Sequence, residues 1–254
     1  MAVLLELVDL SKRFGQVVVA EDLNLSVGEG EAVGVVGPNG AGKTSLFGMI
    51  SGELPPDSGE IRFAGQRITG VEAAARCRMG IGRTYQVPRP FQGMTVFENV
   101  LVAAQQGGGE HGAASHRLAA RTLEQTNLGE LSNRLAGRLG LLDRKRLELA
   151  RALATRPRLL LLDEVAGGLT DPEVSGLVDI VRAARADGTA VIWIEHVVRA
   201  LTESVERLVC LAVGRKVGDG DPGTVLASPQ VRELFLGTEP DSDLDIQPHL
   251  VPAV

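Results

Sequence analysis

One octapeptide constrains the fold more than any other part of the sequence: Gly37-Pro38-Asn39-Gly40-Ala41-Gly42-Lys43-Thr44. It matches the phosphate-binding pattern G-x-x-x-x-G-K-[ST] in full. An apolar run at residues 31–36 precedes it, and a segment with helical spacing at residues 43–51 follows. Glycines let backbone N–H groups turn inward around phosphate oxygens, and a helix start adds partial positive charge. The pattern predicts a nucleotide site; a chance glycine-rich turn is the alternative, and the flanking elements argue against it.

Two further apolar runs end in polar side chains. Residues 159–162 lead into Asp163 and Glu164, and residues 191–194 lead to His196. In a parallel sheet such positions meet at the edge where ligands bind. With Lys43 on the β- and γ-phosphates and the Thr44 hydroxyl on Mg²⁺, we expect Asp163 in the Mg²⁺ shell and Glu164 as general base. His196 is expected to bond the γ-phosphate. The alternatives are a strand ending in two solvated acids and a structural histidine.

The alternation of strand and helix patterns predicts an α/β protein with a parallel sheet. Strands are predicted at residues 2–8, 16–25, 31–36, 60–63, 66–68, 158–162 and 190–194, and helices at residues 43–51, 95–105, 117–127, 144–155 and 172–186. A mostly helical insert with a glycine-rich loop at 106–115 interrupts the core. The predicted domains are a core of residues 1–85 and 143–237, an insert of residues 86–142, and a mobile tail of residues 238–254.

Composition excludes several classes of protein. The net charge of −6 argues against a strongly basic nucleic-acid binder. No apolar run approaches the ~20 residues that a membrane-spanning helix needs. The first ten residues carry Glu6 and Asp9 without a basic region, so no signal peptide is expected. A membrane role would therefore come through a partner. Cys77 and Cys210 are expected to be buried free thiols.

Together these residues resemble the nucleotide-binding subunits of ATP-binding cassette (ABC) transporters, from about Val3 to Gly237. The resemblance implies a P-loop NTPase (RecA-like) core with an antiparallel β subdomain and a helical ABC subdomain insert. It implies ATP and Mg²⁺ as ligands. The residues expected to bind ATP are Phe14, Gly37, Pro38, Asn39, Gly40, Ala41, Gly42, Lys43, Thr44 and Ser45. Phe14 would stack on adenine, with a core phenylalanine as the alternative.

The resemblance also gives Gln86 a role as the Q-loop glutamine, near Mg²⁺ and the attacking water; a merely exposed glutamine is the alternative. The run Gly82-Arg83-Thr84-Tyr85-Gln86 and the run Ile194-Glu195-His196 look more narrowly like the ATPases of branched-chain amino-acid importers. Importers of that group also carry urea, short amides and other amino acids. The implied partners are a second ABC ATPase, transmembrane permease subunits and, indirectly, an extracytoplasmic solute-binding protein, with no nucleic acid. The implied location is peripheral, at the cytoplasmic face of the membrane.

One departure from the family pattern concerns the signature Leu-Ser-Gly-Gly-Gln. Its place is taken by Leu139-Gly140-Leu141-Leu142-Asp143. In the family this segment caps the γ-phosphate bound to the opposite subunit. Without the serine and both later glycines, close backbone approach is less easy. We therefore expect the nucleotide site on this chain's own phosphate loop to be intact when a partner supplies a proper signature. The site on the opposite subunit, which residues 139–143 complete, is expected to be weaker. This inequality suits a heterodimer.

Two other functions remain open from the sequence. The first is a catalytically impaired, structural nucleotide-binding subunit, which the altered signature favours. The second is a soluble, non-transport ABC ATPase, but such proteins usually have two cassettes or a long coiled-coil insert. A P-loop GTPase is disfavoured because no Asn-Lys-x-Asp motif occurs. A P-loop kinase would not need Glu164 and His196 in this arrangement.

Overall fold

The computed structural model describes residues 2–196 and 201–236. Its elements, in chain order, are β1 (Val3–Phe14), β2 (Val17–Gly28), β3 (Ala32–Val36), α1 (Lys43–Ser51), β4 (Ser58–Phe63), β5 (Gln66–Arg67), α2 (Ala73–Arg78), β6 (Ile81–Arg83), α3 (Val96–Gln106), α4 (Ala113–Gln125), the 3₁₀ turns η1 (Gly129–Leu131) and η2 (Ala136–Arg138), α5 (Leu141–Ala154), β7 (Leu159–Asp163), α6 (Asp171–Ala186), β8 (Ala190–Ile194), β9 (Arg207–Ala212), β10 (Arg215–Gly220), α8 (Pro222–Ala227) and α9 (Pro229–Leu236). The predicted tail at 238–254 lies outside the described residues.

The central sheet has the strand order β10-β9-β3-β8-β7-β6 in the described part of the chain. Its strands pair in parallel, except that β10 pairs antiparallel with β9. β3, β7 and β8 are buried along their whole length. Their apolar sequences fit this position because a parallel sheet is covered on both faces. The predicted parallel sheet is confirmed, and the carboxyl ends of its parallel strands share one edge.

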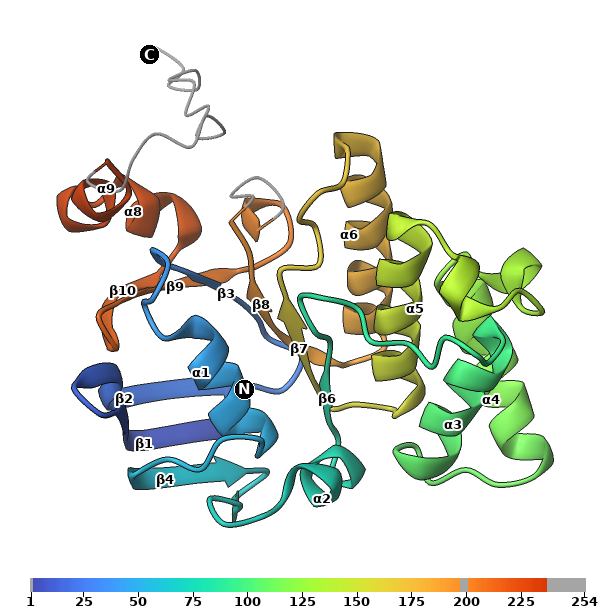
Figure 1. Ribbon diagram of the computed structural model, residues 1–254. Coiled ribbons are helices and arrows are strands. Elements are labelled where there is room, and N and C mark those ends of the chain that lie inside the picture. The colour runs from blue at the N-terminus through green and yellow to red at the C-terminus, as the bar shows by residue number, and fades with distance from the viewer. Residues whose placement is uncertain (1, 197–200, 237–254) are drawn as a thin grey trace.

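Alternate side chains of the central sheet enter two hydrophobic layers. Along β7, Leu159 and Leu161 join the layer that contains α1 and the second sheet, whereas Leu160 and Leu162 join the layer under α6. Figure 1 shows α1 between the two sheets, with α5 and α6 on the other side of the central sheet. This packing fixes the start of α1 relative to the end of β7.

The second sheet is antiparallel and has the order β2-β1-β4-β5 in the described residues. Its first strand, predicted at residues 2–8, continues as β1 to Phe14. The pairing with β2 shifts register between Leu7 and Leu10, where Asp9 has φ +48°. This bulge interrupts the side-chain alternation without ending the strand, which is why the sequence pattern stops too early.

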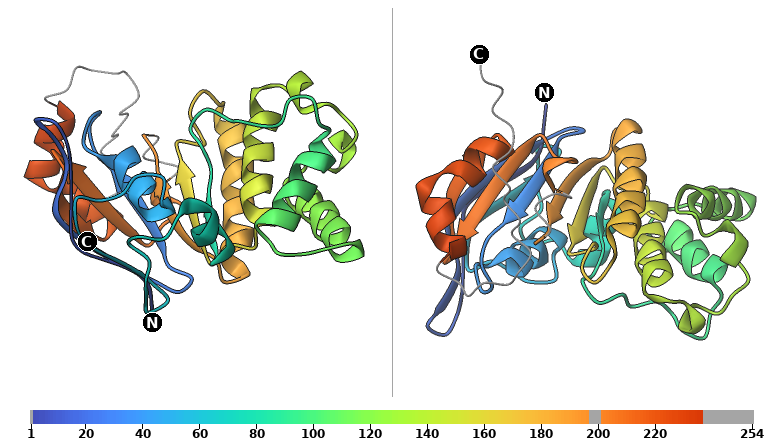
Figure 2. Two further views of the ribbon diagram at one scale, coloured as in Figure 1. Left: turned by 60° about the horizontal axis from the view of Figure 1, so that its bottom comes forward. Right: turned by 90° about the horizontal axis from the view of Figure 1, so that it is seen from above.

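α3, α4 and α5 form a separate helical cluster. Both views in Figure 2 place α3 and α4 at the end of the molecule opposite β1 and β2. Val96, Leu123 and Leu147 share the core of this cluster, so α5 belongs to it as well as to the layer under α6, which contains Leu149. The insert predicted from residue 86 to residue 142 is therefore mostly helical, and its packing includes a helix that continues into the core.

Two of these helices begin earlier than predicted. α4 begins at Ala113 rather than at residue 117, which shortens the predicted loop. α5 begins at Leu141 rather than at residue 144, after an extended Gly140. The segment assigned to the signature thus includes the first turn of a helix, because Leu141, Leu142 and Asp143 are the first residues of α5.

In the described residues, no helix combines the length and the hydropathy that crossing a bilayer requires. Both cysteines are free. Cys210 is buried, as predicted, and burial raises the pKa of its thiol to about 11. Cys77 is only half-buried, so the predicted full burial is wrong for this residue.

Candidate nucleotide-binding site

The loop between β3 and α1 is shaped by close backbone contacts. A Cβ built on Gly42, which has φ +99°, would lie 2.0 Å from the Val19 carbonyl oxygen in β2. A Cβ on Gly37 would lie 2.1 Å from the Leu211 carbonyl oxygen in β9. Only glycine combines this left-handed backbone with such an approach. The loop is thereby held against both sheets at the start of α1.

The Lys43 ammonium group lies inside this loop. Its Nζ donates hydrogen bonds to the carbonyl oxygens of Gly37 at 2.7 Å and Pro38 at 3.1 Å. Burial lowers the pKa of Lys43, and the charges of Glu164 and Asp163 oppose this effect. The next residue, Thr44, is exposed, and Ser45 is half-buried. A cation and two hydroxyl-bearing residues therefore stand at one helix start.

The first turn of α1 fits an anion. It has no acidic residue, and no side chain caps its backbone N–H groups. Such unpaired N–H groups, together with the helix dipole, attract phosphate. With Lys43 beside them, the turn has the donors and charge that a nucleotide triphosphate requires.

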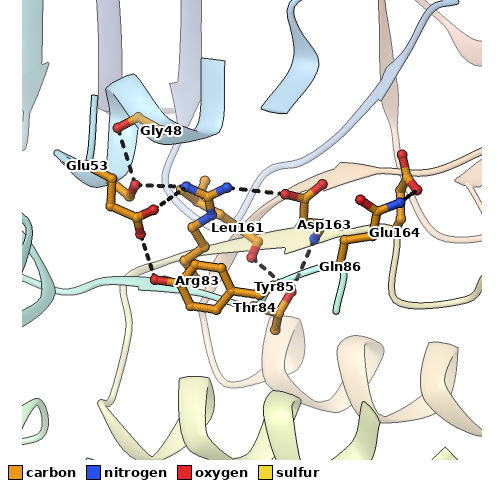
Figure 3. Close-up of polar contacts among 10 residues, drawn as sticks. Gly48, Glu53, Arg83, Thr84, Tyr85, Gln86, Leu161, Asp163 and Glu164 are labelled. Carbon is orange, nitrogen blue, oxygen red and sulfur yellow. Dashed lines mark hydrogen bonds and ion pairs between the residues drawn. The ribbon is translucent and has the colours of Figure 1, made fainter. Parts of the chain in front are cut away.

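Two predicted site residues from distant parts of the sequence, Gln86 and His196, both contact the carboxylate of a third, Glu164. Gln86 Nε2 donates a hydrogen bond to Glu164 Oε2 (Figure 3). His196 Nε2 lies 2.9 Å from Glu164 Oε1. Glu164 follows the end of β7, Gln86 lies just beyond β6, and His196 lies just beyond β8. The shared strand edge therefore brings Gln86 and His196 to opposite oxygens of Glu164.

Asp163 lies one residue earlier, at the buried end of β7, and is 3% exposed. Its backbone N–H donates to Thr84 Oγ1 at 3.1 Å, and Arg83 Nη2 lies 3.2 Å from its Oδ2 (Figure 3). Burial raises the pKa of Asp163, although the charge and hydrogen bond of Arg83 act in the opposite direction. The carboxylate is thus held in place from β6.

The metal ligands that the described residues offer are few. In the described part of the chain, no group of three or more His, Cys, Asp or Glu side chains could hold a metal ion. Mg²⁺ in phosphate-handling sites commonly uses one or two protein oxygens and takes the rest from phosphates and water. The Thr44 hydroxyl and the Asp163 carboxylate fit that kind of site, and Gln86 offers a neutral amide oxygen.

Phe14 closes β1 with its ring half-exposed. Lys12 Nζ lies 5.5 Å from the ring centroid. The alternative of a core phenylalanine is therefore wrong, because half of the residue is exposed. Its adenine contact stays a prediction.

The structure places the segment assigned to the signature at the start of α5. Leu139 is buried, Gly140 precedes α5 in an extended conformation, and Leu141 is half-exposed. Asp143 puts a negative charge in the first turn of α5. An acid there stabilises the helix but repels an approaching phosphate.

Sequence reasoning missed two residues that contact Asp163 and Glu164. Arg83 bonds Asp163. Lys145 of α5 is buried, and its Nζ donates to the Glu164 carbonyl oxygen at 3.2 Å. Gln86, Lys145 and Glu164 line a cavity of about 290 Å³. Arg83 ends a short apolar strand that is absent from the predicted strands, and Lys145 stands in the charged run at residues 143–146, so no local pattern marked either residue.

The chain is similar to proteins of one family over most of its length. The ABC transporter family matches residues 20–167. The high-affinity branched-chain amino acid transport ATP-binding protein BraF of Pseudomonas aeruginosa is 35% identical, over 92% of this chain and 98% of BraF. The lipopolysaccharide export system ATP-binding protein LptB of Acidithiobacillus ferridurans is 34% identical, over 94% and 99%. A crystal structure of an ATP-binding cassette of an ABC transporter in its ADP conformation aligns with TM-score 0.84 and 29% identity, over 93% of this chain and 100% of that one.

Proposed function

The chain belongs to the ABC transporter family, and from this premise we propose that it powers a solute importer of the branched-chain amino-acid type. As a member of that family it binds and hydrolyses ATP and serves a transporter. The observation that carries the proposal is the arrangement around Glu164, which Gln86 and His196 contact on opposite oxygens. Such an arrangement orients a general base, whereas a purely structural subunit has no need of it.

The nucleotide is held in two places. Backbone N–H groups of residues 37–42 and the Lys43 ammonium group bind the phosphates, together with the hydroxyl groups of Thr44 and Ser45. The exposed ring of Phe14 stacks on adenine. Lys43 exchanges its present bonds to the Gly37 and Pro38 carbonyl oxygens for bonds to the β- and γ-phosphates.

Hydrolysis follows from the same residues. Glu164 accepts a proton from the attacking water, because its carboxylate lies at the strand edge beyond the phosphate loop. His196 and Gln86 hold that carboxylate and sense the γ-phosphate. Thr44, Asp163 and Gln86 would hold Mg²⁺, which would neutralise negative charge on the phosphates.

We propose the domain division of residues 1–85 and 143–237 as core, with residues 86–142 as helical subdomain. The boundary at 142 falls in the first turn of α5, whose side chains pack in both parts. α5 thus couples the subdomain to the core, and Lys145 at this junction contacts the Glu164 backbone.

A second ABC ATPase subunit completes the site. Its signature covers the nucleotide bound here, while residues 139–143 of this chain cover the partner's nucleotide. Leu142 and Asp143 make that cover poorer, so we propose a heterodimer with two unequal sites. The dimer lies at the cytoplasmic face of the membrane, bound to permease subunits. An extracytoplasmic solute-binding protein delivers the solute to these permease subunits.

The solute is a branched-chain amino acid or a related small molecule such as urea or an amide. Similarity to BraF, an amino acid transport protein, supports this class. The similarity to LptB, an export protein, has comparable identity and coverage, so solute uptake needs its own assay. A structural subunit that binds nucleotide without turnover is the second candidate, because of the altered residues 139–143.

Steady-state ATP hydrolysis tests the proposal. We expect the purified chain to bind Mg-ATP and to hydrolyse it when mixed with the partner ATPase subunit. Glu164→Gln should lower turnover at this chain's own site by about 10²–10⁴-fold, the range for a lost general base, without abolishing binding. Equal rates for the chain alone and for the mixture would refute partner dependence. Binding without turnover in the mixture would support the structural subunit instead.

A further inference from the structure

The Arg83 side chain joins three elements of the nucleotide site. It lies at the end of β6, with a side chain that is 9% exposed. Its Nη2 donates to Asp163 Oδ2 at 3.2 Å, at the end of β7. Its Nη1 donates to Ser51 Oγ and Glu53 Oε2, both at 3.2 Å. Figure 3 shows the guanidinium group between Asp163 and Glu53.

Ser51 and Glu53 lie at and just after the end of α1, the helix that begins with Lys43 and Thr44. The guanidinium group therefore ties the far end of that helix to the strand that carries Asp163. Thr44 and Asp163 are the two groups that would meet the same ion from opposite elements. Their separation depends on how α1 sits relative to β7, and Arg83 bonds Ser51 at the end of α1 and Asp163 at the end of β7.

Arg83 is itself fixed from several sides. Its guanidinium carbon lies 5.8 Å from the Phe47 ring centroid and 5.2 Å from the Tyr85 centroid. The Tyr85 hydroxyl donates to Glu53 Oε1 at 2.7 Å. These contacts restrict the orientation of the Arg83 guanidinium group, so the position of the Asp163 carboxylate that it bonds is restricted as well. Arg83 engages only Oδ2 of Asp163, which leaves Oδ1 outside this bond.

We propose that Arg83 is a positioning residue for the magnesium site: it holds Asp163 by one oxygen and fixes it relative to the start of α1, so that Mg²⁺ meets a preoriented ligand. The inference rests on the proposed function, since it takes Asp163 and Thr44 as magnesium ligands. Outer-sphere partners of this kind commonly set metal affinity. A lysine cannot replace this arginine, because one ammonium group cannot span Asp163 and Glu53 with a planar fork.

The test measures how strongly Mg²⁺ increases nucleotide affinity. A fluorescent ATP analogue is titrated into the full chain with Mg²⁺ and with EDTA, and the ratio of the two dissociation constants is the readout. We expect Arg83→Gln and Arg83→Lys to lower that ratio by about 10–100-fold, the usual effect of losing an outer-sphere partner. Affinity in EDTA should change by less than about twofold, because Arg83 does not touch the phosphate loop. Thermal unfolding of each variant shows that it is folded.

Two controls separate positioning from general support of the helix. Arg76 also holds the end of α1, through its bonds to the carbonyl oxygens of Met49 at 2.6 Å and Ile50 at 2.9 Å, but it does not contact Asp163. Arg76→Lys should preserve the ratio. In an Asp163→Asn background, Arg83→Gln should change the ratio by less than about twofold, because the coupled partner is gone.

The outcomes distinguish this inference from the proposed function. If the chain binds the analogue with a clear Mg²⁺ effect and Arg83→Gln keeps that effect, the inference is wrong and the proposed function stands. An Arg76→Lys variant with the same loss would assign the effect to the helix end and would overturn it too. A native chain that binds no analogue would refute the proposed function, and the inference with it.

Discussion

Gly42 and Gly40 allow a direct test of why the phosphate loop has its shape. Both have positive φ, +99° for Gly42 and +80° for Gly40. A Cβ on Gly42 would lie 2.0 Å from the Val19 carbonyl oxygen, whereas a Cβ on Gly40 would meet nothing within 4 Å. Replacing each glycine by alanine therefore separates backbone strain from the contact with β2.

The magnitudes follow from these two terms. A left-handed backbone costs an L residue about 1–2 kcal/mol, and this is the whole expected loss for Gly40→Ala. In Gly42→Ala, the Val19 oxygen must also retreat from 2.0 Å to at least 3.0 Å. Overpacking of this kind adds about 1–3 kcal/mol. The free energy of unfolding should thus fall by about 2–5 kcal/mol for Gly42→Ala when the two terms are combined.

Urea denaturation of both variants measures this difference. Gly30→Ala serves as a matched control, because Gly30 has φ +70°, nothing within 4 Å, and a position outside the phosphate loop. It should resemble Gly40→Ala in stability and the native chain in nucleotide affinity. Equal losses for Gly40→Ala and Gly42→Ala would refute the reasoning, since the contact with β2 would then relax at no cost.

Two further predictions concern buried polar side chains. Burial raises the pKa of Glu195, so its contribution to stability is present below the unfolded-state pKa and is lost as pH rises through the folded-state pKa. Urea denaturation at several pH values between the unfolded-state and folded-state pKa of Glu195 should therefore show that the free energy of unfolding of the native chain, relative to that of Glu195→Gln, declines as pH rises. A difference in free energy that stays constant with pH would contradict this prediction. Asn99, fully buried, bonds both backbone groups of Phe91 and the carbonyl oxygen of Thr95. Asn99→Ala should lower the free energy of unfolding by about 2 kcal/mol and speed hydrogen exchange at Phe91; unchanged exchange would mean that other contacts hold this segment.

The sequence predicts the start of the site well because the decisive information is local. The strand at residues 31–36, the glycine loop and the helix at 43–51 follow one another, and the structure has α1 at those same residues. The meeting of Glu164 and His196 is a longer-range prediction. It follows from a rule of parallel sheets, that the carboxyl ends of neighbouring strands share an edge. Gln86, in contrast, is placed near them only by the family resemblance, because strand β6 (Ile81–Arg83) was not predicted.

What the sequence does not show depends on contacts between distant segments. Arg83 reaches Asp163 across 80 positions, and Lys145 reaches Glu164 across 19. Neither pair has a local pattern that names its partner. The length of β1 is hidden for another reason, because a bulge at Asp9 reverses the side-chain alternation on which strand prediction relies.

The two halves that this chain would contribute to a dimer differ in physical character, and that difference carries the proposal of unequal sites. At its own nucleotide, α1 presents a first turn without acids, and Lys43 lies beside it. At the partner's nucleotide, the first turn of α5 carries Asp143 and two leucines, so its helix dipole is opposed by a carboxylate.

Replacing residues 140–143 by Ser-Gly-Gly-Gln removes that charge and restores close backbone approach. In the heterodimer we expect this replacement to raise turnover while Glu164→Gln of this chain is present, because only the partner's site then hydrolyses ATP. A replaced chain with unchanged turnover in that background would mean that residues 140–143 do not limit the second site.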